Sequence, residues 1–160
     1  MASTITSSQK INSTDARKSQ QAFGFTAPAG TTTLFSTGVM AGLGSDAGAL
    51  FTPTFSGHLR VEIMCDGANN TAADGIQCQL SYGTGAAPAA NAAKTGTQVG
   101  ASPQQVNSSL AGSVSAVGQI TVEWVLDLLV GTQYWFDLMY GAVTGGTATL
   151  SQLAVIIEEY

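Results

Sequence analysis

Apolar and polar residues alternate with a period of two along three runs in the last third of the chain. In the first run, residues 120–127, one face carries Ile120, Val122, Trp124 and Leu126. Two similar runs follow at residues 134–140 and 150–157, each after a break that contains glycine. β-Branched and aromatic residues dominate these runs, which favours strands over helices. The pattern predicts three strands in the core of a β-sandwich.

The clearest alternation in the sequence is HLRVEIMCD, residues 58–66, and a second run follows at residues 76–82. Cys65 and Cys78 fall on the apolar faces of these two runs, on either side of the polar loop at residues 66–75. A hairpin around that loop would place the thiols nearly opposite each other. Buried cysteines usually act as small apolar residues, and a disulfide stays open as an alternative.

The rest of the chain reads as short strands and irregular loops. Phe23 to Phe25 predicts an edge strand, and residues 83–100, rich in Gly and Ala, predict an extended surface loop. Nineteen glycines against four prolines also favour many turns. Roughly eight to ten strands result, which predicts an all-β fold, an antiparallel β-sandwich of the jelly-roll kind.

A polar N-terminal arm precedes the predicted sandwich. Residues 1–22 contain few large apolar side chains, so we expect an extended arm before a single domain at residues 23–160. Residues 1–20 carry three basic residues and one acidic residue, a net charge of +2, whereas the remaining 140 carry two basic and nine acidic residues, a net charge of −7. The basic residues of the arm, which could dock on an acidic neighbour or stay solvated, are Lys10, Arg17 and Lys18.

Charge and hydropathy limit the kinds of partner. A net charge of −5 argues against a nucleic-acid partner, because phosphate contacts need a basic face. No charged segment followed by an apolar segment opens the chain, and no uncharged apolar run approaches the roughly 20 residues of a spanning helix. We therefore expect no signal peptide, no membrane partner and synthesis in a cytoplasm.

Candidate chemistry is sparse. His58 is the single histidine, and no G-x-S-x-G motif accompanies it, so we expect a surface or interface histidine rather than a catalytic one. Residues 66–74, DGANNTAAD, offer oxygen ligands for calcium without EF-hand spacing, and a plain polar loop is the preferred interpretation. Three further carboxylates, Glu123, Asp127 and Asp137, are expected in solvent or at an interface, and Glu158 and Glu159 are expected in water. The sequence thus predicts no enzyme, no metal site and no cofactor.

Two of the closing runs are apolar on both faces. In residues 134–140, Trp135 lies opposite Tyr134 and Tyr140, and regular alternation in the last run sets Leu150 and Ile156 opposite Leu153 and its neighbours. One face of each run must then meet something other than the central core. Aromatic residues concentrate in interface cores, so we predict a subunit interface that includes Tyr134, Trp135, Tyr140 and Ile156.

The order of three segments resembles a known family. FTPTFSGHLRVEI at residues 51–63 is followed by GTQYWF at 131–136 and by TLSQLAVIIEE at 149–159. Over residues 50–160 this order resembles the jelly roll of tumour-necrosis-factor-like and complement-globular-head trimers. The resemblance implies a homotrimer.

A second resemblance concerns SYGTGAAPAANAAKTGTQVG, residues 81–100. This segment is similar to small structural proteins of tailed bacteriophages, whose jelly-roll trimers decorate capsids as cement proteins or form parts of fibres. The resemblance implies a non-enzymatic virion protein on the capsid surface, made in the bacterial host cytoplasm, with the major capsid protein as partner. The alternative is a receptor- or carbohydrate-binding module of a fibre or tail tip, with loops 66–75 and 83–100 as its contact surface.

Overall fold

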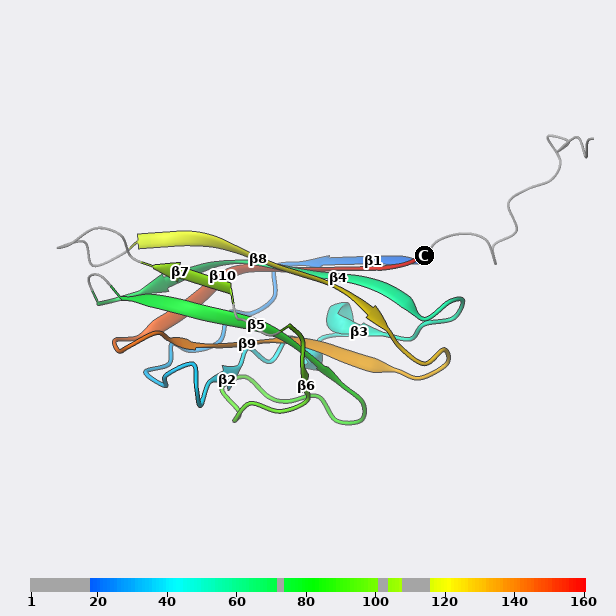
Figure 1. Ribbon diagram of the computed structural model, residues 1–160, viewed down its shortest axis with the longest axis horizontal. Coiled ribbons are helices and arrows are strands. Elements are labelled where there is room, and N and C mark those ends of the chain that lie inside the picture. The colour runs from blue at the N-terminus through cyan, green and yellow to red at the C-terminus, as the bar shows by residue number, and fades with distance from the viewer. Residues whose placement is uncertain (1–17, 72–73, 101–103, 108–115) are drawn as a thin grey trace, which may run out of the picture.

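The computed structural model describes residues 18–71, 74–100, 104–107 and 116–160, with no side chains described at 104–107 and 116–117. Two antiparallel sheets pack face to face (Figure 1). Sheet A has four strands, in the order β1 (Ser19–Phe23), β10 (Ala148–Glu159), β4 (His58–Asn69) and β8 (Ala116–Asp127). Sheet B contains β2 (Val39–Met40), β9 (Tyr134–Ala142), β5 (Gly75–Gly83) and β6 (Thr97–Gln98), with β3 (Leu50–Phe51) beside β9 and β7 (Gln104–Asn107) beside β5.

The strand pairs are nested in the sequence. The innermost pairs join β5 to β6 and β7, the next joins β4 to β8, the next joins β2 and β3 to β9, and the outermost joins β1 to β10. A long antiparallel hairpin rolled into two sheets gives this order, which is that of a jelly roll. The predicted fold class is therefore confirmed. Two 3-10 turns, η1 (Leu43–Ser45) and η2 (Ala47–Ala49), link β2 to β3.

The core lies between the inner faces of the two sheets. Alternate residues of β4 point inward and are buried, as the sequence pattern predicts. Together with the inward residues of β8 and β10 in the same sheet, they face the inward residues of β5 and β9. The largest side chains of this core include Leu59, Ile63, Leu80, Phe136 and Tyr140. In the part of the chain that the structure describes, no helix has the length and hydropathy to cross a bilayer.

The predicted hairpin between residues 58–66 and 76–82 is wrong. The connection after β4 crosses the sandwich, so β4 and β5 lie in different sheets and do not pair. Cys65 and Cys78 still meet, because both point into the core from facing sheets, and the thiols are free and buried. Burial, reinforced by the neighbouring Cys65 thiol, raises the pKa of Cys78.

A β-bulge changes the faces of β10. The pairing of β10 with β4 shifts register between Ser151 and Ala154, and Gln152 adopts a positive φ of 52°. The extra residue brings Leu150 to the core side, where it is 3% exposed, together with Leu153. Regular alternation places Leu150 on the outer face, so that prediction is wrong.

The first strand begins earlier than the sequence suggests. The expected edge strand starts at Phe23, whereas β1 ends there and pairs with β10 from Ser19 onward. Its inward residues fit against the segment of the 3-10 turns, where the side-chain amide of Gln20 donates hydrogen bonds to the carbonyls of Gly48 and Leu50. Residues 19–22, which the sequence assigns to the arm, therefore belong to sheet A.

Candidate functional site

Lys18 fixes the point at which the N-terminal arm joins the sandwich. Its Nζ donates a 2.6 Å hydrogen bond to the carbonyl of Thr52 and lies 4.4 Å from the centre of the Phe51 ring. Its own carbonyl accepts a hydrogen bond from the backbone N–H of Glu159 at 2.8 Å. The N-terminal arm thus joins the sandwich beside the end of β10. The other two basic residues predicted for partner binding, Lys10 and Arg17, lie outside the described residues.

Glu159 is a buried carboxylate at the same end. Its oxygens accept hydrogen bonds from the backbone N–H groups of four consecutive residues, 54–57, at distances of 2.8 to 3.1 Å. Desolvation opposes ionisation, but these donors outweigh it and lower the pKa of Glu159 to about 2. The expectation that Glu159 lies in water is wrong, because the last inward position of β10 points it under this loop.

Asp137 is a second buried carboxylate, on the outer face of β9. It accepts hydrogen bonds from the N–H groups of Gly42 at 3.0 Å, Leu43 at 3.1 Å and Leu138 at 2.7 Å. Burial outweighs these donors and raises the pKa of Asp137 to about 6. The sequence placed Asp137 in solvent or at an interface, whereas the carboxylate holds η1 against sheet B.

The chain's own loops cover the outer face of β9. Trp135 is 4% exposed and packs with Met40 and Met139, and Gly83 and Gly96 lie directly against its indole ring. A Cβ on Gly83 would come within 2.4 Å of that ring, so only glycine allows this approach. The second apolar face of β9 is therefore covered by loops of the same chain, without a second subunit.

The other predicted interface residues differ in position. Tyr134 and Tyr140 are buried in the central core, and the Tyr140 hydroxyl donates to the carbonyl of Ala29 at 2.7 Å. Burial raises the pKa of Tyr140 to about 12. Ile156 is half-buried, on the outer face of sheet A, opposite Glu62 of β4. The oligomer interface stays a prediction. Of the four residues predicted for it, Ile156 is the one that lies on the open outer face of sheet A.

Charged side chains gather on the outer face of sheet A. Arg60 bonds to Glu62 at 2.8 Å, to Glu123 at 2.7 Å and to Glu158 at 3.1 Å. Hydrogen bonds to Glu123 and Glu158 raise the pKa of Arg60, and the bond to Arg60 lowers the pKa of Glu123. These solvated pairs contribute little to stability. They give the centre of the face three carboxylates around one guanidinium.

His58 lies at the edge of this charged face, in contact with Asp127. With Ser56 two residues before it, His58 has the residue types of a Ser-His-Asp site around it. The Ser56 hydroxyl donates to the carbonyl of Tyr160 at 2.7 Å and accepts from the backbone N–H of His58, so its hydroxyl proton is committed to a carbonyl. The surface position predicted for His58 is confirmed, as its side chain is 57% exposed.

Polar side chains at the two ends of the loop between β4 and β5 form hydrogen bonds with neighbouring backbone groups. The Asp74 carboxylate accepts from the N–H groups of Gly75 at 2.7 Å and Thr144 at 3.0 Å, and the Asn69 amide donates to the carbonyls of Gly75 and Gly145. Desolvation opposes ionisation of Asp74, but these donors outweigh it and lower the pKa of Asp74. Within the described residues no three potential ligands cluster as a metal site. The loop oxygens thus bind the neighbouring turn, as a plain polar loop does.

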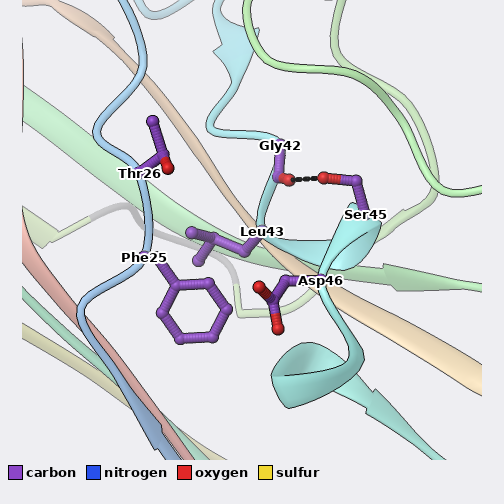
Figure 2. Close-up of a pocket in the computed structure, with 6 residues that line it drawn as sticks. All are labelled: Phe25, Thr26, Gly42, Leu43, Ser45 and Asp46. Atoms are coloured by element: carbon purple, nitrogen blue, oxygen red, sulfur yellow. Dashed lines mark hydrogen bonds between the residues drawn. The ribbon is translucent and has the colours of Figure 1, made fainter.

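A small pocket opens between the segment that follows β1 and the 3-10 turns (Figure 2). Its volume is about 90 Å³, and its lining combines the Phe25 ring with the Asp46 carboxylate and the backbone and side chains of Thr26, Gly42, Leu43 and Ser45. A water occupies about 30 Å³ of liquid, and pockets for small molecules start near 300 Å³. The pocket is therefore sized for a few waters or one protruding group of a ligand. Loops 66–75 and 83–100, expected as a contact surface, do not line it.

Comparisons with known proteins give no family. No protein-family model matches the sequence, and no curated protein matches it. Among solved structures, 90% of the chain aligns with 33% of a chain in the structure of infectious bursal disease virus Gx strain, with a TM-score of 0.49 and 8% identity. It also aligns over 89% of its length with 13% of dimeric latent PorU from Porphyromonas gingivalis, with a TM-score of 0.41 and 13% identity. The chain spans a third or less of each, and neither likeness bears on its function.

Proposed function

We propose that the chain is a non-enzymatic structural protein of a tailed-bacteriophage virion, a homotrimeric decoration protein that binds the major capsid protein and stabilises the assembled head. The observation that carries this proposal is the anchoring of the arm: β1 and Lys18 hold its start at one end of a closed jelly roll. A sandwich with a tethered basic segment is suited to attach to a protein surface. The sequence resemblance to phage decoration proteins agrees with it.

In this proposal the protein stabilises the shell by binding alone, without a catalysed reaction. Lys10 and Arg17 precede the anchored Lys18 in the sequence, and in this proposal they pair with carboxylates on the shell. A protein that binds the assembled shell more tightly than its dissociated subunits stabilises assembly by mass action. Attachment would then raise the temperature at which the head opens.

The test compares the full chain with a variant that lacks residues 1–17. This truncation keeps β1, which a cut at residue 22 would remove. Both proteins are mixed with expanded heads of the phage that encodes the chain, and mass photometry gives the oligomeric state of each. We expect two trimers, of which only the full chain decorates heads. Failure of the full chain to bind any head, or a monomer in solution, would contradict the proposal.

A charge variant separates the role of the basic groups from that of the arm as a whole. The double substitution Lys10→Gln with Arg17→Gln should weaken binding to heads and reduce its dependence on salt. Lys94→Gln is the matched control, because Lys94 is an exposed lysine of the body whose Nζ bonds to the carbonyl of Ser36. Equal binding by both variants would show that charge in the arm has no part in attachment.

The pocket favours a second candidate, a carbohydrate-binding module of a fibre or tail tip. Phe25 and Asp46 place an aromatic ring beside a carboxylate in a loop pocket, which is the combination that stacks on a sugar and binds its hydroxyls. Trimers that do not bind heads but retain labelled surface polysaccharide of the host would support this candidate. Loss of that retention in Asp46→Ala would assign it to the pocket.

A further inference from the structure

Four apolar side chains are exposed at the end of the sandwich where the arm begins. They are Leu129, 72% exposed, Phe55, 54%, Val130, 51%, and Tyr160, 44%. They come from the loop before β4, the turn between β8 and β9, and the end of β10, which Figure 1 shows at one end of the molecule beside the C-terminus. We call these four residues the apolar tip. Single exposed apolar side chains are ordinary, but a group of them at one place indicates an interaction surface.

Backbone hydrogen bonds join the loops of the apolar tip. The N–H of Gly131 donates to the carbonyl of Pro53, and the N–H of Leu128 donates to the carbonyl of Gly57, both at 2.8 Å. Gly57 has a positive φ of 77°, and a Cβ there would lie 2.1 Å from the Leu128 carbonyl oxygen. Only glycine permits this contact, so the two loops form one unit.

Glu159 holds the same loop from beneath. Its carboxylate binds the N–H groups of Thr54, Phe55, Ser56 and Gly57, which fixes the backbone that carries the exposed Phe55 ring. The carbonyl of Tyr160 is held by Ser56, and its ring stacks on His58 at 6.3 Å. A surface whose backbone is already ordered loses less entropy on binding.

We propose that the apolar tip seats in an apolar recess of the capsid shell whose rim is acidic, next to the binding site of the basic arm. The inference rests on the proposed function and names the second contact of the same attachment. We infer the partner of the apolar tip from the place where the arm leaves the sandwich. Lys18, at that place, contacts Phe51 and Thr52, a few residues before Phe55. In this proposal the site that binds the arm adjoins the apolar tip, and carboxylates at its rim pair with Lys10 and Arg17.

A lipid surface is a less suitable occupant. Asp127 borders the apolar tip with its side chain 80% exposed, and Glu158 lies next to the buried Glu159 on the outer face of sheet A. Anionic headgroups would be repelled by these carboxylates. A protein recess can instead carry its acidic groups beside β1, where the arm leaves the sandwich, at the opposite edge of sheet A from β8 and its Asp127.

The test measures the binding of Leu129→Ser and Phe55→Ser proteins to expanded heads by co-sedimentation at increasing concentration. The matched control is Val125→Ser, since Val125 is 53% exposed but lies on the outer face of sheet A, opposite Arg60 of β4. Each substitution in the apolar tip should weaken binding about tenfold, and the control should leave it unchanged. Thermal denaturation and mass photometry of each variant check that fold and trimer are kept.

The outcomes separate the inference from the proposed function. If the unaltered protein binds heads and the apolar-tip variants bind as tightly, the apolar tip is not a shell contact, and this inference fails alone. If the unaltered protein does not bind heads, the proposed function itself fails. Dissociation of the trimer in Leu129→Ser would assign the apolar tip to the subunit interface, and retention of the unaltered protein on phosphatidylglycerol vesicles would assign it to membranes. Either result would overturn the inference.

Discussion

The outer faces of the two sheets differ in what covers them. On sheet B the chain covers its own strand: Trp135, Asp137 and Met139 of β9 are buried under the segment around β2 and η1 and the loop after β5. On sheet A the corresponding face is open, with Glu123 and Val125 of β8 in solvent. The comparison teaches that apolar residues on both faces of a strand need no second subunit when long loops fold back. The outer face of sheet A therefore stays open in the part of the chain that the structure describes.

The two buried carboxylates show the same contrast. Glu159, at the end of sheet A, receives four consecutive backbone N–H groups and its pKa falls to about 2. Asp137, under the cover of sheet B, receives three, and its pKa rises to about 6 because burial is the larger effect. Each carboxylate fixes a loop, one beneath the apolar tip and one over the covered face. These two carboxylates, like Asp74 beside the turn before β10, hold loops of this jelly roll in place.

The largest effect should come from removing the side chain on which the cover of sheet B packs. Trp135→Ala leaves a cavity between β9 and the loop after β5, and we expect a loss of about 4 kcal/mol in the free energy of unfolding. Trp124→Ala makes the same change in β8, where the ring is 45% exposed, and should cost about 1–2 kcal/mol. Urea denaturation of both variants measures the difference. Because Trp124 occupies an inward position of β8, equal losses would show that the loops over Trp135 add nothing to the packing of that ring.

Removal of the carboxylate beneath the apolar tip should come next. Glu159→Ala leaves the N–H groups of residues 54–57 without their acceptor, and we expect a loss of about 3 kcal/mol. Glu158→Ala is the control on the adjacent, solvated side chain, which pairs with Arg60. Hydrogen exchange should also speed up at residues 54–57 in the first variant alone. Unchanged exchange there would show that Glu159 does not order the loop.

The pH dependence of unfolding should divide between the two carboxylates. Because the pKa of Glu159 is lowered from 4.5 to about 2, its stabilisation is complete above pH 4.5 and is lost as the pH falls towards 2. Because the pKa of Asp137 is raised from 3.8 to about 6, the folded state binds the proton more tightly, so stability falls as the pH rises through that range.

Variants of the two carboxylates test this division. Glu159→Gln should flatten the profile of unfolding free energy below pH 4.5, and Asp137→Asn should flatten it between pH 3.8 and about 6. The slopes are compared rather than the absolute stabilities, since each variant also loses hydrogen bonds. A profile that keeps its upper slope in Asp137→Asn would assign that slope to another group.

The smallest effect is expected on the open face. Arg60→Ala should move the midpoint of thermal denaturation by no more than about 2 °C, because exposed ion pairs contribute little. The variant leaves Glu62, Glu123 and Glu158 without their common partner, so the remaining change should shrink as salt is added. A large, salt-independent loss would show that the Arg60 cluster has a structural role that its exposure does not suggest.

The sequence predicts the fold better than the site. The period of two along residues 58–65 and 120–126 identifies strands and their inward faces, because one side of sheet A meets solvent. The exception is Trp124, which is 45% exposed although it shares the parity of the buried Val122 and Leu126. The pattern could not show that Leu150 turns inward, since the bulge at Gln152 resets the alternation without a glycine or proline to mark it. The hairpin predicted between the strands of Cys65 and Cys78 is wrong for a similar reason. A polar loop can join two neighbouring strands of one sheet or two strands in different sheets, and the sequence pattern is the same in both cases.

The buried carboxylates were missed for a different reason. Glu159 and Asp137 accept from backbone groups roughly a hundred residues away in the sequence, and no local pattern reports such contacts. Glu159 does carry one usable signal, because it continues the inward series of Val155 and Ile157. The apolar tip could not be recognised either, since its loops meet only in the folded chain.

The measurement that tests the account most directly is a cryo-electron microscopy map of expanded heads decorated with the full-length chain. The account predicts density for a trimer of jelly rolls whose apolar tip, with Leu129 and Phe55, faces the shell beside the density of the arm. Heads that stay bare at saturating protein would contradict the account, and so would trimers that meet the shell through the opposite end, where β9 turns into β10 at residues 143–147.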